Sequence, residues 1–378
     1  MRTTHAIVER AEALVPLLEQ HRPYGEAHAR LAPEVVAACR DAGMYGLYAP
    51  VEVGGEEAPL PDVFAAGVRV AAADPSAAWL MVNSAALAEY APYLDPARWP
   101  EVFTRPLGPY GLSAAVTGTL EPTEGGYLLN GTWPLVTGVL DATWATLNCH
   151  VISPDGRRPV RAVIVRTADL IIDPIWENAV AMRGTGSHQV RAEAVPVPAE
   201  LVVNSGAPPQ INRALQRVPF FVRAGVLNSA VPIGILRSAV AAASAELAGK
   251  VSTIFGTKAA DSTALLELVA DASLSLAFLE RGVLAAIEEL WQYAEGDQEL
   301  PISLRATVAG APFHAVEVAR DLTSRLYARS SRAAFFAGHP LEGAMRNIHA
   351  VAYGLEPLRP IHHAAGRVQL GLDPNMTI

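Results

Sequence analysis

Between about residues 111 and 210 the sequence changes from helical to β-strand character, and beyond residue 210 it changes back. Short runs rich in β-branched residues, such as 127–133 and 160–166, are separated there by Gly, Asn and Asp. Such runs predict strands, and the residues between them predict turns. Because this stretch cannot make a helical domain, we expect a small antiparallel barrel or sandwich between two helical regions.

The regions on either side show helical periodicity. Near the N-terminus Ala11, Leu14 and Leu18 fall on one stripe, and a second helix is predicted from Pro33 to Ala42, before Gly43. Beyond residue 218, long Ala/Leu-rich segments predict an antiparallel helical bundle; they cover 222–250, 262–295, 304–337 and 341–353. The predicted domains are 1–110 (helical), 111–210 (β) and 211–378 (helical bundle).

Composition excludes several classes of function. The chain has 378 residues, 51% hydrophobic and 18% charged, with a formal net charge of −9. That charge, without a Lys/Arg cluster, argues against a nucleic-acid or anionic-membrane partner. Cys39 and Cys149 lie far apart without metal-ligand spacing, which predicts a reduced, cytoplasmic protein and no metal site. Apolar runs such as 63–73 are too short to span a bilayer, so we expect no membrane segment.

One polar turn is a candidate ligand-binding element. In Met182-Arg183-Gly184-Thr185-Gly186-Ser187-His188-Gln189-Val190, two glycines, a threonine and a serine occur within a few residues. The backbone N–H groups and hydroxyls of such a turn can point at one ligand. An ordinary connection between strands has the same composition, so the turn by itself leaves both interpretations open.

Motifs along the whole chain strengthen the ligand-binding interpretation. They are Pro50 with Gly54-Gly55, Asp74 to Trp79, Gly125 to Gly138, Trp176 with Met182 to Val190, and Pro340-Leu341 with Met345 to Ala350. Together they resemble the acyl-CoA dehydrogenase fold superfamily and, within it, the flavin-dependent monooxygenases that act as oxygenase components or N-oxygenases. The resemblance implies an α+β multidomain fold with an N-terminal helical domain, a central antiparallel β-barrel or sandwich and a C-terminal four-helix bundle.

The resemblance also implies a flavin site for FAD or FMN. Two segments of the β domain line the ring in this superfamily, and here they contain Ser113 and Ala114, and Trp133, Leu135 and Thr137. The implied place of the Thr137 hydroxyl is near flavin N5. Thr185 and Ser187 are expected at the ribityl or phosphate end, and Arg183 and Arg346 are candidate phosphate partners. The alternatives are a core role for Trp133, a solvated side chain for Arg183 and a helix-surface salt bridge for Arg346.

Catalytic groups are less well matched to the family. The candidates are Thr137, His349, and Asn83, which lies on the helix expected to cover the pocket. The monooxygenases carry a histidine where this chain has residues 86–88, and a second near Gly354. His362-His363 could replace it from the tail. Asn347 stands where the family has Asp.

Further residues have ordinary structural interpretations. We expect His188 to face water, Glu89 to lie on the surface, Tyr90 to lie in the core, and Cys149-His150 to belong to strand packing.

Three functions follow. The first is a reduced-flavin-dependent monooxygenase that hydroxylates or N-oxygenates a small molecule through a C4a-(hydro)peroxyflavin. A separate reductase would supply its flavin, because no GxGxxG motif follows a strand. The second is an acyl-CoA dehydrogenase with a relocated base, since Tyr353-Gly354-Leu355-Glu356-Pro357 lacks the usual carboxylate turn. The third is a flavin-binding protein without redox catalysis. A homotetramer or dimer is expected.

Overall fold

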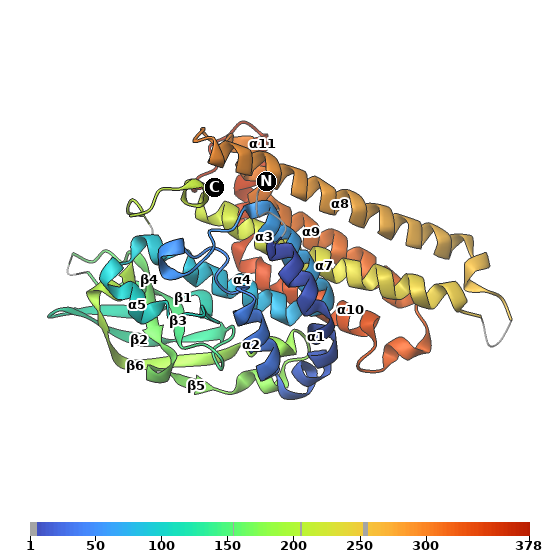
Figure 1. Ribbon diagram of the computed structural model, residues 1–378, viewed down its shortest axis with the longest axis horizontal. Helices are drawn as coiled ribbons and strands as arrows, with labels where there is room; N and C mark the ends of the chain where they lie inside the picture. Colours follow the sequence, from blue (N-terminus) through green and yellow to red (C-terminus); the bar gives the residue numbers. More distant parts are fainter. Residues whose placement is uncertain (1–5, 154, 205, 252–255) are drawn as a thin grey trace.

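The computed structural model describes residues 6–378 except 154, 205 and 252–255, and it places one sheet beside a set of long helices (Figure 1). Of the N-terminal helices, the first four lie between the sheet and the far end of the long helices, and the short fifth helix lies beside the sheet (Figure 1). Their bounds are α1 Ala6–His28, α2 Pro33–Asp41, α3 Leu60–Ala73, α4 Pro75–Ala88 and α5 Trp99–Val102. Helix α4 begins directly after Asp74, whose carboxylate caps it by accepting hydrogen bonds from the Ser76 and Ala77 backbone N–H groups, at 2.8 and 3.4 Å.

The sheet has seven strands in the order β5-β6-β2-β1-β3-β4-β7. Their bounds are β1 Gly111–Thr123, β2 Gly126–Val136, β3 Trp144–Val151, β4 Val160–Arg166, β5 Ile171–Asp173, β6 His188–Pro198 and β7 Val202–Val203. The β1/β2, β2/β6, β3/β4, β4/β7 and β5/β6 pairs are antiparallel, but β1 and β3 run parallel. The purely antiparallel prediction is therefore wrong, and the sheet is mixed. Because β2 runs antiparallel to β1, it ends beside the first residues of β1. Strand β3 starts from that same end of the sheet and therefore runs parallel to β1.

Two strands depart from regular pairing at the same place. Strand β1 shifts register against β3 between Ser113 and Gly118, and β2 shifts against β6 between Trp133 and Val136. Leu135 in the second bulge has a φ of 56°, a left-handed conformation that is strained for a branched side chain. Bulges of this kind redirect side chains and commonly lie beside ligand sites.

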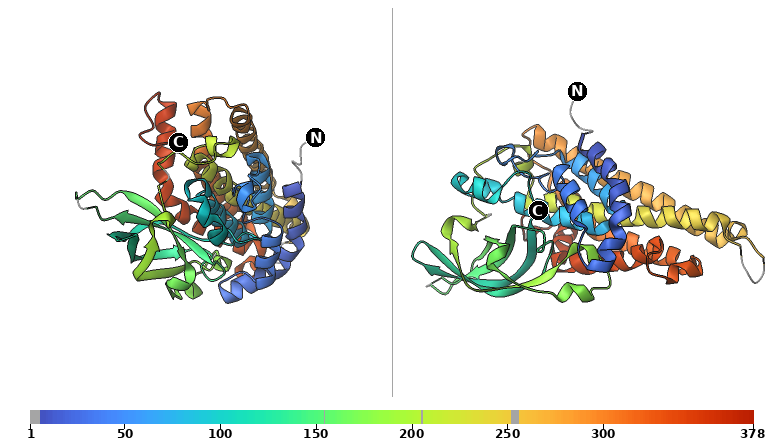
Figure 2. Two further views of the ribbon diagram at one scale, coloured as in Figure 1. Left: turned by 60° about the vertical axis from the view of Figure 1, so that its left-hand side comes forward. Right: turned by 60° about the horizontal axis from the view of Figure 1, so that its bottom comes forward.

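The C-terminal helices are α6 Ala214–Arg217, α7 Phe220–Gly249, α8 Thr263–Glu295, α9 Ile302–Arg329, α10 Pro340–Leu355 and α11 Arg359–Gln369. The segment predicted as one helix over 304–337 ends at Arg329, and a separate 3-10 turn follows at Arg332–Phe335. Two further views show α7, α8 and α9 running side by side away from the sheet (Figure 2). The division into three domains remains a prediction.

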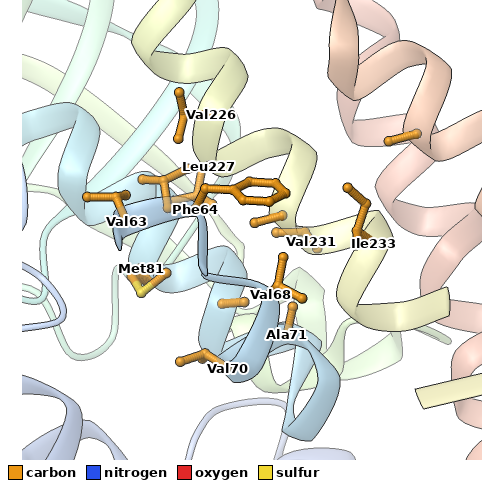
Figure 3. Packing of buried hydrophobic residues seen from close by; sticks show 14 of the residues in the cluster. Val63, Phe64, Val68, Val70, Ala71, Met81, Val226, Leu227, Val231 and Ile233 are labelled. Atoms are coloured by element: carbon orange, nitrogen blue, oxygen red, sulfur yellow. The ribbon is translucent and has the colours of Figure 1, made fainter. Parts of the chain in front are cut away.

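Helices α3 and α7 form the centre of the helical core. Phe64 of α3 lies beside Leu227 of α7, and Val68 lies beside Val231 (Figure 3). The helices approach closely at two glycines. A Cβ on Gly67 would lie 2.8 Å from the Ala230 Cβ, and one on Gly234 would lie 2.7 Å from a carbonyl of α3. Among the described helices, α7 is long and apolar enough to cross a membrane, but 78% of its most apolar window is buried in this core.

Candidate functional site

A cavity of about 710 Å³ lies between α4, the bulged parts of β1 and β2, and the end of α10. Its volume and mainly apolar lining are typical of a small-molecule or cofactor site. The lining residues are Trp79, Asn83, Leu112, Ser113, Ala114, Ala115, Pro134, Leu135, Thr137, Trp176, Met182, Ser187, Ala350, Val351, Tyr353, Gly354, Glu356 and Pro357. The two β-domain segments predicted to line a flavin ring, 112–115 and 133–138, therefore both reach this cavity.

Three buried hydroxyl groups form a chain at one side of the cavity. The Thr137 and Ser187 hydroxyls lie 3.0 Å apart, and the Ser187 and Thr185 hydroxyls lie 2.8 Å apart. The Gly138 backbone N–H also donates to the Thr185 carbonyl, at 3.0 Å, which joins the two segments. Thr137 and Ser187 line the cavity, whereas Thr185 supports them from behind. Thr137 was expected near flavin N5, and Thr185 and Ser187 at the ribityl or phosphate end, but the fold brings the three hydroxyls together.

The polar turn is held by contacts from distant helices. Met182 has a φ of 51°, and its backbone N–H donates to Asn347 Oδ1 of α10 at 2.8 Å. Gly184 is required at its position, because a Cβ there would lie 2.9 Å from the Ser76 Cβ of α4. The turn therefore positions Ser187 at the cavity through backbone contacts to α4 and α10. A role for Asn347 in holding this turn was not predicted.

The two candidate phosphate arginines are engaged in protein contacts. Arg183 donates to the backbone carbonyls of Glu26, Glu177 and Ala179, and it does not line the cavity. Arg346 pairs with Glu342 on its own helix and with Glu26 of α1, and it donates to the Val180 carbonyl. The helix-surface salt bridge considered for Arg346 is therefore present. Phosphate binding by either arginine stays a prediction.

Trp133 does not form a wall of the cavity. Its side chain is fully buried on the other face of the sheet, and its indole N–H donates to the Asn148 carbonyl at 2.9 Å. The ring fills the space over Gly118, where a Cβ would lie 2.0 Å from it. Gly118, which lies within β1, thus has a packing role. Ser113, Ala114 and Leu135 do line the cavity, and the Ser113 hydroxyl donates to the Pro134 carbonyl at 3.1 Å.

The predicted histidine groups lie elsewhere. His349 is exposed on α10, pointing away from the cavity lining, so the prediction of a catalytic role has no support from its position. His362 lies in a separate hollow of about 860 Å³ between α8, α9 and α11, and His363 is exposed. His188 is buried, not solvated, and its Nδ1 accepts a hydrogen bond from the Trp176 backbone N–H at 3.3 Å. Burial lowers the pKa of His188.

Helix α4 contributes residues with different roles. Asn83 lines the cavity as expected, but Trp79, one turn earlier, was not predicted to do so. Tyr90 is buried, as predicted. Glu89 is not a surface residue: it is buried and forms an ion pair with Arg223 of α7 at 3.2 Å. Cys149 is buried in the sheet core, in agreement with strand packing. The helical period could have predicted Trp79 at the cavity, because Trp79 lies four residues before Asn83 and residues four apart share a face of a helix.

The cavity suits a flavin ring in its chemistry. An isoalloxazine is flat and apolar on its faces, and needs a few hydrogen-bonding groups at its edge. Leu112, Ala115 and Pro134 supply apolar wall, and Thr137 and Ser187 supply hydroxyls. Among the described lining residues none is Lys, Arg or His, and the one carboxylate is that of Glu356.

Comparison with known proteins supports the predicted resemblance. Residues 226–353 match the family model described as acyl-CoA dehydrogenase, C-terminal domain. The flavin-dependent monooxygenase oxygenase subunit HsaA of Rhodococcus jostii (strain RHA1) is 28% identical over 360 residues, covering 91% of this chain and 92% of that protein. The predicted resemblance to the acyl-CoA dehydrogenase fold and its monooxygenase branch is confirmed.

Two solved structures support the same assignment. XiaF from Streptomyces sp., in complex with FADH2 and glycerol, has a TM-score of 0.88 at 25% identity, covering 99% of this chain and 97% of that one. The 3-HSA hydroxylase from Rhodococcus sp. RHA1 has a TM-score of 0.89 at 25% identity, covering 99% and 98%. The fold is therefore shared over essentially the entire chain.

Proposed function

We propose that this protein is the oxygenase component of a two-component, reduced-flavin-dependent monooxygenase. The observation that carries the proposal is the cavity of about 710 Å³, with the Thr137 and Ser187 hydroxyls on one side and the α4 side chains on another. The relatives named above are flavin-dependent monooxygenases or hydroxylases, and one solved neighbour holds FADH2. Reduced FAD or FMN is the cofactor of this function, and a separate reductase supplies it.

The described residues have distinct tasks in this function. Leu112 to Ala115 and Pro134 to Thr137 would hold the flavin ring, and Thr137 and Ser187 would bond its edge. When bound, reduced flavin would supply the two electrons with which one atom of dioxygen enters the substrate and the other leaves as water. The Thr137 hydroxyl is held in place by Ser187, so its orientation is set before any ligand enters. The apolar wall excludes water from the reacting groups.

An acyl-CoA dehydrogenase activity fits the cavity less well. Such an enzyme needs a carboxylate base to remove an α-proton. Glu356 is the carboxylate among the described lining residues, and it is exposed and bonded to Arg359 at 2.7 Å. The Arg359 guanidinium lowers the pKa of Glu356, which makes it a weaker base. The relocated-base alternative is therefore disfavoured.

A flavin-binding protein without redox catalysis has one observation in its favour. The described lining contains no histidine, whereas the resemblance leads one to expect two near the flavin. This second function predicts flavin binding without transfer of oxygen to any substrate. We also propose, from the composition of the chain and the apolar surface of its long helices, a cytoplasmic homotetramer or dimer, and the cavity volume favours a small-molecule substrate.

The test is to mix the purified protein with anaerobically reduced FMN or FAD and then with oxygen. A monooxygenase is expected to bind the reduced flavin and to reoxidise it with less hydrogen peroxide when an aromatic substrate is present, forming oxygenated product. Tight flavin binding with quantitative peroxide and no product from a broad substrate panel would favour the non-redox alternative. No binding of either reduced flavin would contradict both.

A further inference from the structure

Helix α4 presents a polar pair to the cavity. Asn83 follows Trp79 by one helical turn, and both side chains line the cavity. The Asn83 Nδ2 donates to the Trp79 backbone carbonyl at 2.7 Å. This bond fixes the amide, so that Oδ1, the acceptor, is left without a partner among the described residues. Asn83 is only 7% exposed, and its free acceptor is therefore available to a molecule in the cavity rather than to bulk water.

The Trp79 indole supplies the matching donor. Its N–H bonds to none of the described residues, although a half-buried indole usually finds an acceptor. The ring lies against Gly354 of α10, where a Cβ would come within 3.2 Å of Cζ2. A glycine at this position leaves room for the indole, and the family's histidine at this point is absent.

The other residues that line the cavity disfavour a charged ligand. The described lining has no cationic side chain, and the carboxylate of Glu356 is already paired with Arg359. A buried anion without a partner is costly, so an anionic substrate has no favourable place here. A hydroxyl group, by contrast, donates one hydrogen bond and accepts others.

We propose that Trp79 and Asn83 are the specificity-determining pair of the cavity, and that they select a neutral ring bearing a hydroxyl group. The hydroxyl donates to Asn83 Oδ1 and accepts from the Trp79 indole N–H. This inference rests on the proposed function for its biological meaning, but recognition by the pair is a binding property that does not need turnover.

Three probes of similar size test the pair: 2-naphthol, its methyl ether 2-methoxynaphthalene, and the anion 2-naphthoate. Binding is measured by equilibrium dialysis, with and without oxidised FMN. The parent is expected to bind 2-naphthol about threefold to tenfold more tightly than the ether for each hydrogen bond that the ether loses. It is expected to bind 2-naphthoate most weakly.

Asn83→Leu is expected to reduce the preference for naphthol over the ether, with little change in affinity for the ether. Trp79→Phe is expected to weaken the binding of both probes, because the ether oxygen can also accept the indole N–H. Asn228→Leu is the matched control, because Asn228 makes the same bond to the carbonyl four residues earlier, at 2.9 Å, outside the cavity. It should leave the preference unchanged. If Asn83→Leu does not fold, Asn83→Ala takes its place, and the preference of the parent for naphthol still tests the pair.

Equal binding of naphthol and ether by the parent would overturn the proposal. An unchanged preference in Asn83→Leu, an unchanged affinity for both neutral probes in Trp79→Phe, or tighter binding of naphthoate than of naphthol would do the same. Loss of flavin reoxidation or product with the naphthol preference retained would instead count against the proposed function, and the recognition pair would stand.

Discussion

At the scale of single residues, the Thr137 hydroxyl is the group whose position bears most directly on the chemistry. It lines the cavity and is 3.0 Å from the Ser187 hydroxyl, so it has a fixed neighbour on one side and the ligand space on the other. Thr185, which we grouped with Ser187, lies behind both and does not line the cavity. A substitution of Thr137 therefore changes a side chain that lines the cavity, whereas a substitution of Thr185 changes one that only supports Ser187.

We predict that Thr137→Val binds reduced flavin nearly as well as the parent but releases hydrogen peroxide faster. One neutral hydrogen bond contributes about 0.5–1.5 kcal/mol, a threefold to tenfold effect on binding at most. Its effect on reactivity can be larger, because no water replaces the hydroxyl in a dry site. Stopped-flow mixing with oxygen and a peroxide assay measure this. Thr117→Val, in an exposed part of β1, is the control. Unchanged affinity and peroxide release would place Thr137 away from the flavin.

Asp74 gives the stability of the protein a dependence on pH. Burial raises its pKa from 3.8 to about 6, although the backbone N–H groups of Ser76 and Ala77 act in the opposite direction. The folded state therefore keeps a proton between these pH values that the unfolded chain has released. The resulting stabilisation is complete below the unfolded pKa and is lost as pH rises through about 6.

We predict that Asp74→Asn, which keeps a capping oxygen, removes this dependence. The free energy of unfolding of the parent relative to the variant should fall by up to roughly 3 kcal/mol between about pH 4 and pH 7. Guanidinium unfolding at several pH values measures the difference. A difference that is constant with pH, or one that grows as pH rises, would show that Asp74 titrates below this range.

At the scale of elements, a buried ion pair joins α4 to α7. The Glu89 and Arg223 side chains are 3% and 4% exposed, and Arg223 also donates to the Leu215 and Val218 carbonyls. Burial raises the pKa of Glu89 to about 7, against the lowering effect of Arg223. Burying the Glu89 carboxylate without a cationic partner would cost more free energy than burying it paired with Arg223.

We predict that Glu89→Ala destabilises the protein by about 3–5 kcal/mol, because it leaves the Arg223 charge buried without a partner. The double variant Glu89→Leu with Arg223→Met should recover much of that loss, since neither charge remains. Asp321→Ala, which breaks an exposed pair with Arg325, should change little. Chemical unfolding of all four proteins gives the comparison. A double variant no more stable than Glu89→Ala would mean that packing, not the unpaired charge, dominates.

At the scale of the whole molecule, helix α8 presents large apolar side chains to solvent. Leu266, Leu274 and Phe278 are 56%, 54% and 69% exposed. The spacing places them along one side of the helix. Figure 1 shows α8 along the outer edge of the long helices, so this side is not covered by the sheet. Such a surface is typical of contacts between subunits.

We predict that the protein is at least a dimer at micromolar concentration, through the helices of the C-terminal region. Sedimentation velocity should give a mass of two or four chains, and Phe278→Glu together with Leu274→Glu should lower it. Val160→Glu is the control, since Val160 is 47% exposed on the sheet. A monomeric mass for the parent, or an unchanged oligomer in the double variant, would contradict the prediction.

The sequence by itself determined the order of helices and strands, because their periodicity is local. It also identified the polar turn at 182–190 and the two β-domain segments that line the cavity. Those features depend on residues within a few positions of one another, or on motifs that the chain shares with a known fold. The predicted places of Ser113, Ala114, Leu135 and Thr137 at the cavity followed from the motifs.

Only the tertiary structure decided which side chains share a site. Trp133 and Leu135 are two residues apart, yet the bulge with a left-handed Leu135 separates the core face from the cavity face. His349 follows Asn347 by two positions, and the turn of α10 sends one outward and the other to the Met182 backbone. Three further contacts join segments that are far apart in the chain. They are the parallel pairing of β1 and β3, the contact of Trp79 with Gly354, and the buried ion pair of Glu89 with Arg223. Such contacts depend on how whole elements pack, and local periodicity carries no information about the partner that an element will meet.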